Sequence, residues 1–166
     1  MLEVFGQGLL LEAKSGVGKS DLALALVDRG HCLVADDLVE FSAQGDVLIA
    51  RCRSGLEGFL EVRGLGVVNL DQLYGKGAIK PRAVVNLVLL LDAGADDAYD
   101  NLGPRQQQWQ LQGVTVPAWH LPYSAQRNMA LIVETAVRLN LARQQGYDAG
   151  SDLQARLAGL MKQGVA

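Results

Sequence analysis

Short apolar runs broken by turn residues predict five strands in the first fifty positions: 2–5, 9–12, 32–35, 39–41 and 46–50. The first two runs flank Gly6-Gln7-Gly8 and the last two flank a Ser-Ala-Gln-Gly turn, so each pair predicts a β-hairpin. Between the hairpins, residues 20–29 carry apolar side chains at helical spacing, and Gly30 follows as a typical helix end. The apolar face of this predicted helix consists of Leu22, Ala23, Leu26 and Val27.

The second part of the chain contains the strongest strand pattern and the longest helix pattern. Residues 83–91 are apolar except for Asn86, which predicts a strand covered on both faces. Residues 124–145 predict a helix that Gly146 ends, and Ser151 is placed to cap a final helix that runs to Lys162. The apolar stripe of the longer helix consists of Met129, Ile132, Val133, Ala136 and Val137.

Three further segments have a less regular pattern. Residues 60–70 do not predict a helix, because the close pair Gly64 and Gly66 indicates a tight backbone bend. Residues 70–75 predict a short helix, and the polar stretch 92–113 predicts a loop with an edge strand. Helices mixed with strands and hairpins, in a chain of 166 residues, indicate a single α/β domain.

Composition and charge exclude several classes of protein. Fifteen basic and 18 acidic residues give a net charge of −3 without a run of Lys or Arg, so a nucleic-acid partner is not expected. The longest apolar stretch, 83–91, is far shorter than the ~20 residues of a membrane span, and the sequence from Met1 does not resemble a signal peptide. Cys32 and Cys52 are too few and too far apart for a CxxC site or a disulfide framework. We therefore expect a cytoplasmic protein without a membrane partner.

The main chemical motif lies at residues 13–20. We predict that these residues bind nucleotide phosphates, because they form the phosphate-loop (P-loop) pattern with alanine at the usual first glycine: Ala13, Lys14, Ser15, Gly16, Val17, Gly18, Lys19 and Ser20. Gly16 and Gly18 let backbone N–H groups curl into an anion nest, and the dipole of the following helix adds to the attraction. We expect Lys19 to reach the β- and γ-phosphates and the Ser20 hydroxyl to bind Mg²⁺. The alternative, an accidental glycine-rich turn, is disfavoured by the predicted strand before the loop and helix after it.

A P-loop enzyme also needs a carboxylate near Mg²⁺, usually at the end of an apolar strand. Two places qualify, namely Asp36-Asp37 after 32–35 and Asp92 after 83–91. Because neighbouring side chains of a strand point to opposite faces, we expect Asp36 and Asp37 to divide the labour rather than chelate together. One would orient or deprotonate an attacking hydroxyl while the other holds the metal. A plain turn is the alternative at both places, and it is stronger for Asp92, which precedes Ala-Gly.

Histidine and arginine carry weaker signals. We interpret His31 and His120 as structural, and with two histidines and no nearby cysteine a zinc site has little support. Arg127, at the start of the longest predicted helix, suits either phosphate binding or pairing with the face that carries Glu134.

Three segments together resemble a known family: SGVGKS at 15–20, RGHCLVADD at 29–37 and LEVRGLGVVNL at 60–70. The third segment is the specific one, since many unrelated proteins contain a P-loop. The chain resembles the C-terminal catalytic domain of HPr kinase/phosphorylase over about residues 2–147. This resemblance implies a P-loop-containing fold of the phosphoenolpyruvate-carboxykinase-like type, with a mixed sheet and flanking helices. It implies a catalytic domain over 1–147 and a C-terminal helical tail over 148–166.

The resemblance also implies an activity. ATP and Mg²⁺ would support transfer of a phosphoryl group to a serine of HPr, the phosphocarrier of the sugar phosphotransferase system. In the reverse reaction inorganic phosphate attacks phosphoserine and yields pyrophosphate. Asp36 is the implied general base, with Lys19, Arg63 and Arg127 as the other catalytic residues. The implied Mg²⁺ ligands are Ser20, Glu61 and Asp37, and the implied assembly is a homo-hexamer whose C-terminal helices contact a neighbour's HPr.

The chain departs from the family's pattern at several positions. Asp100-Asn101-Leu102 stands where the family has Asp-Arg-Leu, which removes a cation expected at the transferring phosphate, and Arg105 is a nearby substitute. Ser124-Ala125-Gln126 replaces Arg-Pro-Gly in the segment tied to dephosphorylation, and Lys14 replaces an acidic residue. The sequence begins after the family's His-Gly pair and N-terminal regulatory domain. Loss of a positioned arginine can cost about 10³–10⁵ in rate, so we expect reduced activity, above all in the phosphorylase direction.

Two alternatives share the same motifs. One is a P-loop kinase that acts on another protein or on a small hydroxyl compound, and the other is a non-catalytic nucleotide-binding module. The presence of Lys19, Ser20, Asp36 and Glu61 argues against the module, whereas Asn101 argues for it. Because the P-loop contacts phosphates alone, pyrophosphate is an alternative donor to ATP.

Overall fold

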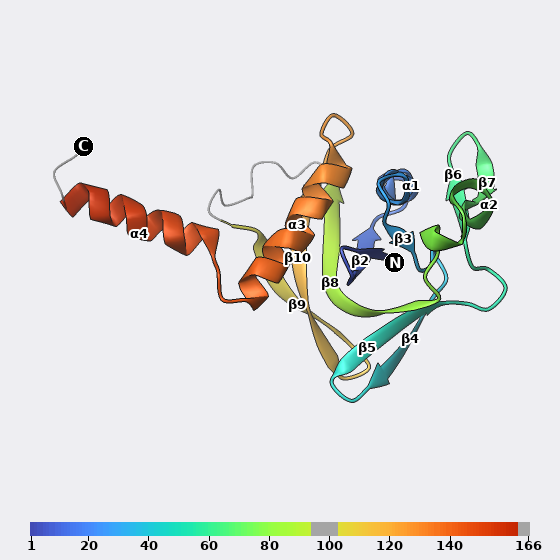
Figure 1. Cartoon of the computed structure of the whole chain (residues 1–166), viewed down its shortest axis with the longest axis horizontal. Helices are drawn as coiled ribbons and strands as arrows, with labels where there is room; N and C mark the ends of the chain where they lie inside the picture. Colours follow the sequence, from blue (N-terminus) through green and yellow to red (C-terminus); the bar gives the residue numbers. More distant parts are fainter. Residues whose placement is uncertain (94–102, 163–166) are drawn as a thin grey trace.

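The computed structural model describes residues 1–93 and 103–162 (Figure 1). Its strands are β1 Leu2–Val4, β2 Gln7–Ala13, β3 Cys32–Leu33, β4 Val39–Gln44, β5 Val47–Cys52, β6 Phe59–Val62, β7 Gly66–Asn69, β8 Arg82–Ala93, β9 Arg105–Leu111 and β10 Val114–Tyr123. Its helices are α1 Lys19–Asp28, α2 Leu70–Tyr74, α3 Met129–Gln144 and α4 Ala149–Lys162, with a 3-10 turn at Lys76–Ala78. The predicted α/β fold with a mixed sheet and flanking helices is confirmed.

The strands form a mixed sheet in which the carboxyl ends of the parallel strands lie side by side. Its order is β3-β1-β2-β8-β10-β9, and β5 joins the β4–β5 hairpin to the start of β8. Strand β8 is parallel to both β2 and β10, while β9 forms the antiparallel edge. Ala13 at the end of β2 lies opposite Leu91, and Tyr123 at the end of β10 lies opposite Ala93. The carboxyl ends of the three parallel strands therefore meet at one edge, where α/β sheets usually bind ligands.

Both faces of β8 are covered, as its apolar sequence predicts. Leu87, Leu89 and Leu91 belong to a buried cluster shared with α1 and α3. Val85 and Val88 belong to a second buried cluster that includes residues of the β4–β5 hairpin. Burial of this apolar surface on both faces stabilises β8, the strand that pairs with β2 just before the P-loop.

Asn86, the polar interruption in β8, has a local role. Its Oδ1 accepts the backbone N–H of Gly8 over 2.8 Å, at the point where the β2–β8 register shifts. A Cβ atom on Gly8 would lie 1.8 Å from the carbonyl oxygen of Val84. The two strands therefore approach too closely here for any residue other than glycine.

Several sequence-based expectations about strands and helices differ from the structure. The sequence does not predict strand β10. Pro117 and Pro122 lie within it, and proline lacks the N–H that a central strand donates. Asp92 lies within β8 and not in a turn. Helix α3 begins at Met129 and not at 124, since the Asn128 side chain caps it by accepting the Leu131 N–H over 3.1 Å.

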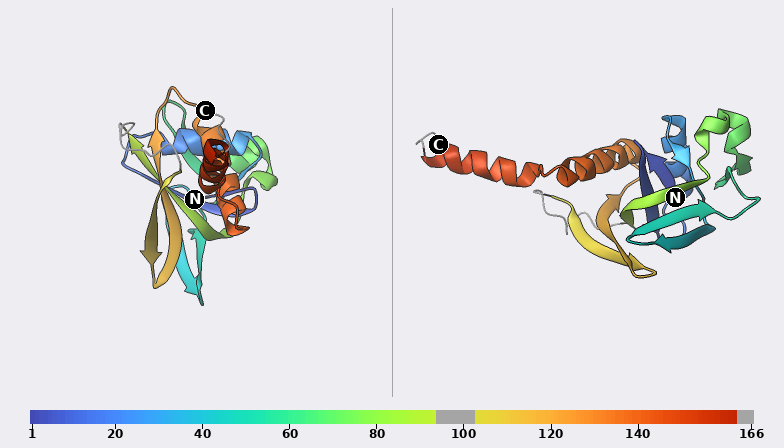
Figure 2. Two further views of the ribbon diagram at one scale, coloured as in Figure 1. Left: turned by 90° about the vertical axis from the view of Figure 1, so that its left-hand side faces the viewer. Right: turned by 60° about the horizontal axis from the view of Figure 1, so that its bottom comes forward.

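The final helix also begins earlier than expected. The side chain of Asp148 accepts the N–H of Ser151 over 3.0 Å and its hydroxyl over 2.8 Å, so Asp148 is the capping residue and Ser151 lies in the first turn. From there α4 extends away from the sheet (Figures 1 and 2). Within the two described ranges, no helix has both the length and the apolar character to cross a membrane.

Candidate functional site: the P-loop cavity

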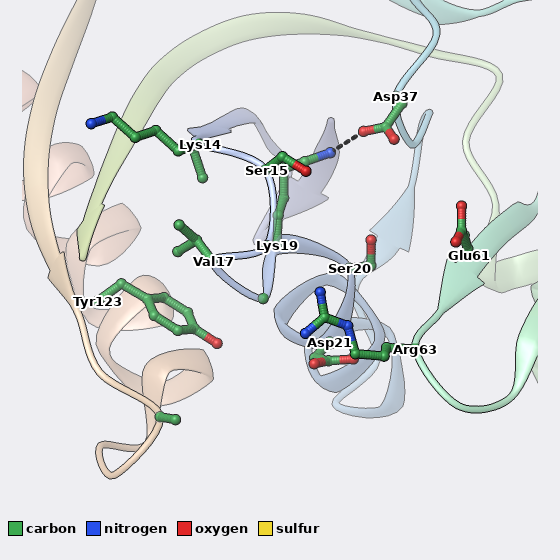
Figure 3. Close-up of a pocket in the computed structure, with 14 residues that line it drawn as sticks. Lys14, Ser15, Val17, Lys19, Ser20, Asp21, Asp37, Glu61, Arg63 and Tyr123 are labelled. Carbon is green, nitrogen blue, oxygen red and sulfur yellow. Dashed lines mark hydrogen bonds and ion pairs between the residues drawn. The ribbon is translucent and has the colours of Figure 1, made fainter.

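The P-loop lines a cavity of about 490 Å³ at the carboxyl end of β2 (Figure 3). All of residues 13–20 line it, as do six residues outside the loop: Asp21, Asp37, Glu61, Arg63, Tyr123 and Ala125. The fold therefore brings the P-loop together with Asp37 and with two residues of the LEVRGLGVVNL segment. That segment forms the β6–β7 hairpin, and Arg63 lies in its turn.

Glycine gives the P-loop its backbone shape. Gly16 and Gly18 have φ angles of +86° and +106°, in the left-handed region that favours glycine. Gly18 is the N-cap of α1 and provides no side-chain hydrogen bond to the helix. The first N–H groups of α1 are therefore left available to an anion, in line with the positive end of the helix dipole.

Lys19 joins the P-loop to both carboxylates that follow β3. Its Nζ lies 2.5 Å from Oδ1 of Asp37 and 3.6 Å from Oδ1 of Asp36. The expectation that these two side chains point to opposite faces is wrong, because residues 36–37 form a bend beyond the end of the strand. Asp37 is 75% exposed and Asp36 is 17% exposed, so the two carboxylates differ in their access to water.

Asp36 is also held from the side of the β6–β7 hairpin. Its Oδ2 accepts the backbone N–H of Glu61 over 3.3 Å. One oxygen of Asp36 thus faces the P-loop lysine and the other contacts β6, which fixes the carboxylate between the two segments.

The oxygen donors on one side of the cavity suit Mg²⁺. Figure 3 shows Ser20, Asp37 and Glu61 on the same side, and all three line the cavity. Mg²⁺ prefers oxygen ligands and is commonly bound by one or two carboxylates together with substrate phosphates. Among the described residues, no group of three or more His, Cys, Asp and Glu side chains could hold a metal ion by itself. The donor set therefore fits a metal that completes its coordination with the phosphates of a bound donor.

The two predicted catalytic arginines lie in different surroundings. Arg63 lines the cavity, and its Nη2 is 3.8 Å from the position that a Cβ on Gly16 would occupy. Arg127 is exposed in the turn before α3 and does not line the cavity, whereas Ala125 does. Glu134, the other suggested partner of Arg127, instead accepts hydrogen bonds from Arg29.

Glu134 forms a largely buried ion pair between α3 and the end of α1. The guanidinium of Arg29 donates to its two oxygens over 2.7 Å and 2.6 Å, and Nε2 of the buried His31 lies 2.9 Å from Oε1. The hydrogen bonds from Arg29, and then from His31, lower the pKa of Glu134 to about 2. This arrangement agrees with a structural role for His31.

Asp92 and His120 belong to a second cavity of about 510 Å³, which Lys14 and Lys19 also line. Nδ1 of His120 lies 2.8 Å from Oδ2 of Asp92, and Nε2 lies 3.1 Å from Oε1 of Gln107. In the backbone register, Arg105 of β9 lies opposite His120 of β10. The segment Asp100-Asn101-Leu102 lies outside the described residues.

Three cavity residues, Asp21, Tyr123 and Ala125, are absent from the site residues predicted from the sequence. Asp21 follows the P-loop directly in the first turn of α1, so proximity in sequence is a signal that could have found it. Tyr123 ends the unexpected strand β10. Burial, and then the nearby charge of Asp21, raise the pKa of Tyr123 above its ordinary value.

This fold and this cavity define a P-loop-containing protein of the mixed α/β class. The family model for the HPr Serine kinase C-terminal domain matches residues 1–157, and the chain belongs to this family. The structure also resembles that of the Hpr(Ser) kinase/phosphatase from Coxiella burnetii, with a TM-score of 0.83 and 31% sequence identity. That match covers 92% of this chain and 93% of the other.

Curated relatives of the chain are named HPr kinase/phosphorylase. The HPr kinase/phosphorylase of Treponema pallidum (strain Nichols) is 39% identical over 169 residues, which is 100% of this chain and 53% of the relative. The HPr kinase/phosphorylase of Geobacillus thermodenitrificans (strain NG80-2) is 38% identical over 166 residues, which is 99% of this chain and 54% of the relative. The chain thus spans about half the length of the curated relatives that it matches.

Proposed function

We propose that this protein is an ATP- and Mg²⁺-dependent serine kinase that phosphorylates HPr and also catalyses the reverse phosphorolysis of phosphoserine-HPr. The observation that carries the proposal is the position of Lys19, whose Nζ contacts Asp37 and lies 3.6 Å from Asp36 at the P-loop. A cation for the transferring phosphate and a carboxylate for the attacking hydroxyl are what phosphoryl transfer to serine requires.

Asp36 is the general base in this proposal. A serine hydroxyl is a weak nucleophile, so it needs a base within hydrogen-bond reach as it attacks. The serine oxygen forms a bond to the terminal phosphorus of ATP, the bond from that phosphorus to its bridging oxygen breaks, and ADP leaves with the electron pair. Asp36 takes the hydroxyl proton. The Glu61 N–H, at 3.3 Å from Oδ2, supports this role because it orients the carboxylate.

The reverse reaction uses the same groups. An oxygen of inorganic phosphate attacks the phosphorus of phosphoserine, the bond to the serine oxygen breaks, and Asp36 returns the proton to that oxygen. Pyrophosphate is the product.

The other residues of the proposed site bind and orient the donor. Residues 13–20 hold its phosphates through backbone N–H groups, and Lys19 contacts the phosphate that is transferred. Ser20, Asp37 and Glu61 hold Mg²⁺, which when bound supplies charge neutralisation at the phosphates. Arg63 lines the cavity and serves as a further cation. Arg127 acts at the edge of the site, where the exposed turn before α3 meets the acceptor.

We also propose a division of the chain into a catalytic domain at 1–147 and a helical tail at 148–166. The direction of α4, which extends away from the sheet, supports this division. The tail carries half-exposed apolar side chains at helical spacing: Leu153, Leu157 and Leu160. Such a stripe suits the proposed homo-hexamer, which light scattering of the purified protein would test. A cytoplasmic location, where ATP is available, completes the proposal.

The experiment that tests the activity is intact-mass spectrometry of HPr from the same organism, incubated with this protein, Mg²⁺ and ATP. We expect one added phosphoryl group with the wild-type chain and none with Asp36→Asn, which keeps the shape of the side chain and removes the base. Asp46→Asn, in the exposed turn between β4 and β5, is the matched control and should keep full activity.

Unmodified HPr, with ATP still bound by the protein, would contradict the choice of acceptor and favour another hydroxyl substrate. Equal phosphorylation by the wild type and Asp36→Asn would contradict the role of Asp36 as base.

A further inference from the structure

The β6–β7 hairpin has apolar side chains on its outer face as well as on its inner face. In an antiparallel sheet with one face on the core, the outward-facing residues are usually polar. Leu60 and Val62 of β6 are buried and supply the packing that holds the hairpin on the core. Phe59 and Val67 are instead 42% and 69% exposed. The hairpin therefore presents apolar surface that the described part of this chain does not cover.

This outer face is continuous with the P-loop cavity. Glu61 lies directly opposite Val67 in the register of the hairpin, and directly opposite residues of an antiparallel pair have their side chains on the same face. Phe59 lies two residues before Glu61 in the same strand, so it shares that face too. Because Glu61 lines the cavity, Phe59 and Val67 flank a residue of the cavity wall.

Two further exposed apolar side chains adjoin residues of the site in the sequence. Leu65 is 74% exposed and lies in the same turn as Arg63, and Leu38 is 56% exposed and directly follows Asp37. Figure 3 shows Asp37, Glu61 and Arg63 on the same side of the P-loop. We call the four exposed residues the apolar rim: Leu38, Phe59, Leu65 and Val67. Exposed apolar side chains that gather beside a site are typical of a surface that binds a partner.

The position of the rim limits what can cover it during the reaction. A hydroxyl that reaches Asp36, the proposed base, arrives beside the backbone N–H of Glu61 that holds this carboxylate. A small hydroxyl compound can reach Asp36 without covering the rim, whereas a protein that presents a serine there brings its neighbouring side chains against it. Apolar side chains beside that serine would be buried favourably, and charged ones would lose their water without gaining a partner.

We propose that the apolar rim is the docking surface for the protein acceptor, and that this acceptor carries apolar side chains next to its serine. The proposal rests on the proposed function, because it assumes phosphoryl transfer to a protein serine at Asp36. It adds the surface that recognises the acceptor, and it favours a protein substrate over a small hydroxyl compound. The rim contributes to the affinity for the acceptor and not to the binding of the donor phosphates.

The test measures steady-state phosphorylation of HPr by Val67→Thr and by the double variant Leu65→Ser/Val67→Thr. Threonine keeps the β-branched shape of valine, so β7 keeps its strand propensity. We expect KM for HPr to rise about 2- to 5-fold in the single variant and about 10-fold or more in the double variant. KM for ATP, and kcat at saturating HPr, should each change less than about twofold, which also shows that the variants are folded.

Val47→Thr is the matched control. Val47 is an exposed valine at the start of β5, in the β4–β5 hairpin, which lies apart from the β6–β7 hairpin (Figure 1). It does not line the cavity, so KM for HPr should stay within about twofold of the wild-type value.

The outcomes separate this proposal from the proposed function. An unchanged KM for HPr in the double variant would overturn the docking role of the rim, while the kinase function would stand. A raised KM for HPr together with a smaller assembly in light scattering would also overturn it, because the rim would then be a contact between copies of this chain. A wild-type protein that binds AMP-PNP but leaves HPr unmodified would overturn the proposed function, and with it this acceptor.

Discussion

Nζ of Lys19 donates to Oδ1 of Asp37 over 2.5 Å, so the cation of the P-loop is already paired with a carboxylate. A phosphate that binds at the loop must compete with Asp37 for this lysine, unless a metal takes over the carboxylate. If Asp37 is a Mg²⁺ ligand, as we propose, it links the charge of the loop to the presence of the metal.

The first prediction concerns Asp37→Asn. In the absence of Mg²⁺ we expect tighter binding of pyrophosphate, by up to about fivefold, because an exposed ion pair contributes only about 0–1 kcal/mol. With Mg²⁺ present, transfer to HPr should need a higher metal concentration than in the wild type. Calorimetry without metal and a Mg²⁺ titration of activity measure the two effects, with Asp46→Asn as control. Tighter binding without any change in metal dependence would remove Asp37 from the Mg²⁺ ligands.

The second prediction concerns Gly18→Ala. Gly18 has φ of +106°, and a Cβ there would meet the Tyr123 hydroxyl at 2.4 Å. We expect the free energy of unfolding to fall by about 1–3 kcal/mol from the left-handed backbone and the close contact together. In a Tyr123→Phe background the contact is relieved in part while the backbone strain stays, so the loss should be smaller.

Urea unfolding of the two single variants, the double variant and the wild type measures this coupling. Gly30→Ala is the matched control, because Gly30 has φ of +92° and no atom within 4 Å of the added Cβ. Its loss should not depend on Tyr123. Strict additivity of Gly18→Ala and Tyr123→Phe would show that Tyr123 moves freely away from the loop.

The third prediction concerns the pH dependence of Glu134. Its pKa is lowered from 4.5 to about 2, and its side chain is 9% exposed. A carboxyl group whose pKa is lower in the folded than in the unfolded state stabilises the protein fully at a pH above its unfolded-state pKa. This stabilisation is lost as the pH falls through the folded-state pKa. We expect Glu134→Gln to lower the free energy of unfolding by about 3 kcal/mol at pH 7, with the difference from wild type narrowing between pH 4.5 and 2.

Urea unfolding at pH 7, 5 and 3 measures this difference. If the two proteins differ by the same amount at pH 7 and pH 3, the ionised form of Glu134 is not what stabilises the contact between α1 and α3.

The parts of the fold and site that the sequence predicts are those determined by neighbouring residues. The P-loop follows from eight consecutive positions, and α1 follows from helical spacing with Gly30 at its end. The strand at β8 follows from an apolar run that only Asn86 interrupts. In each case the local pattern and the tertiary structure favour the same conformation.

The parts that the sequence does not predict depend on contacts between distant residues. Asp36 and Asp37 look like alternating strand positions, yet the bend after β3 turns both toward Lys19. Tyr123 reaches the P-loop only because β10 pairs with β8 despite its prolines. Neither propensity nor periodicity carries information about such pairing.

Strand β8 also affects when the cavity can form during synthesis. The P-loop is made early, but β2 needs β8 beside it, where Leu10 lies opposite Val88, and β8 needs β10. Such pairing between distant segments requires a large loss of loop-closure entropy before the contacts compensate for it. A nascent chain that has emerged only through α1 therefore carries the P-loop sequence without the cavity, which is complete only after Tyr123 at the end of β10 has left the ribosome.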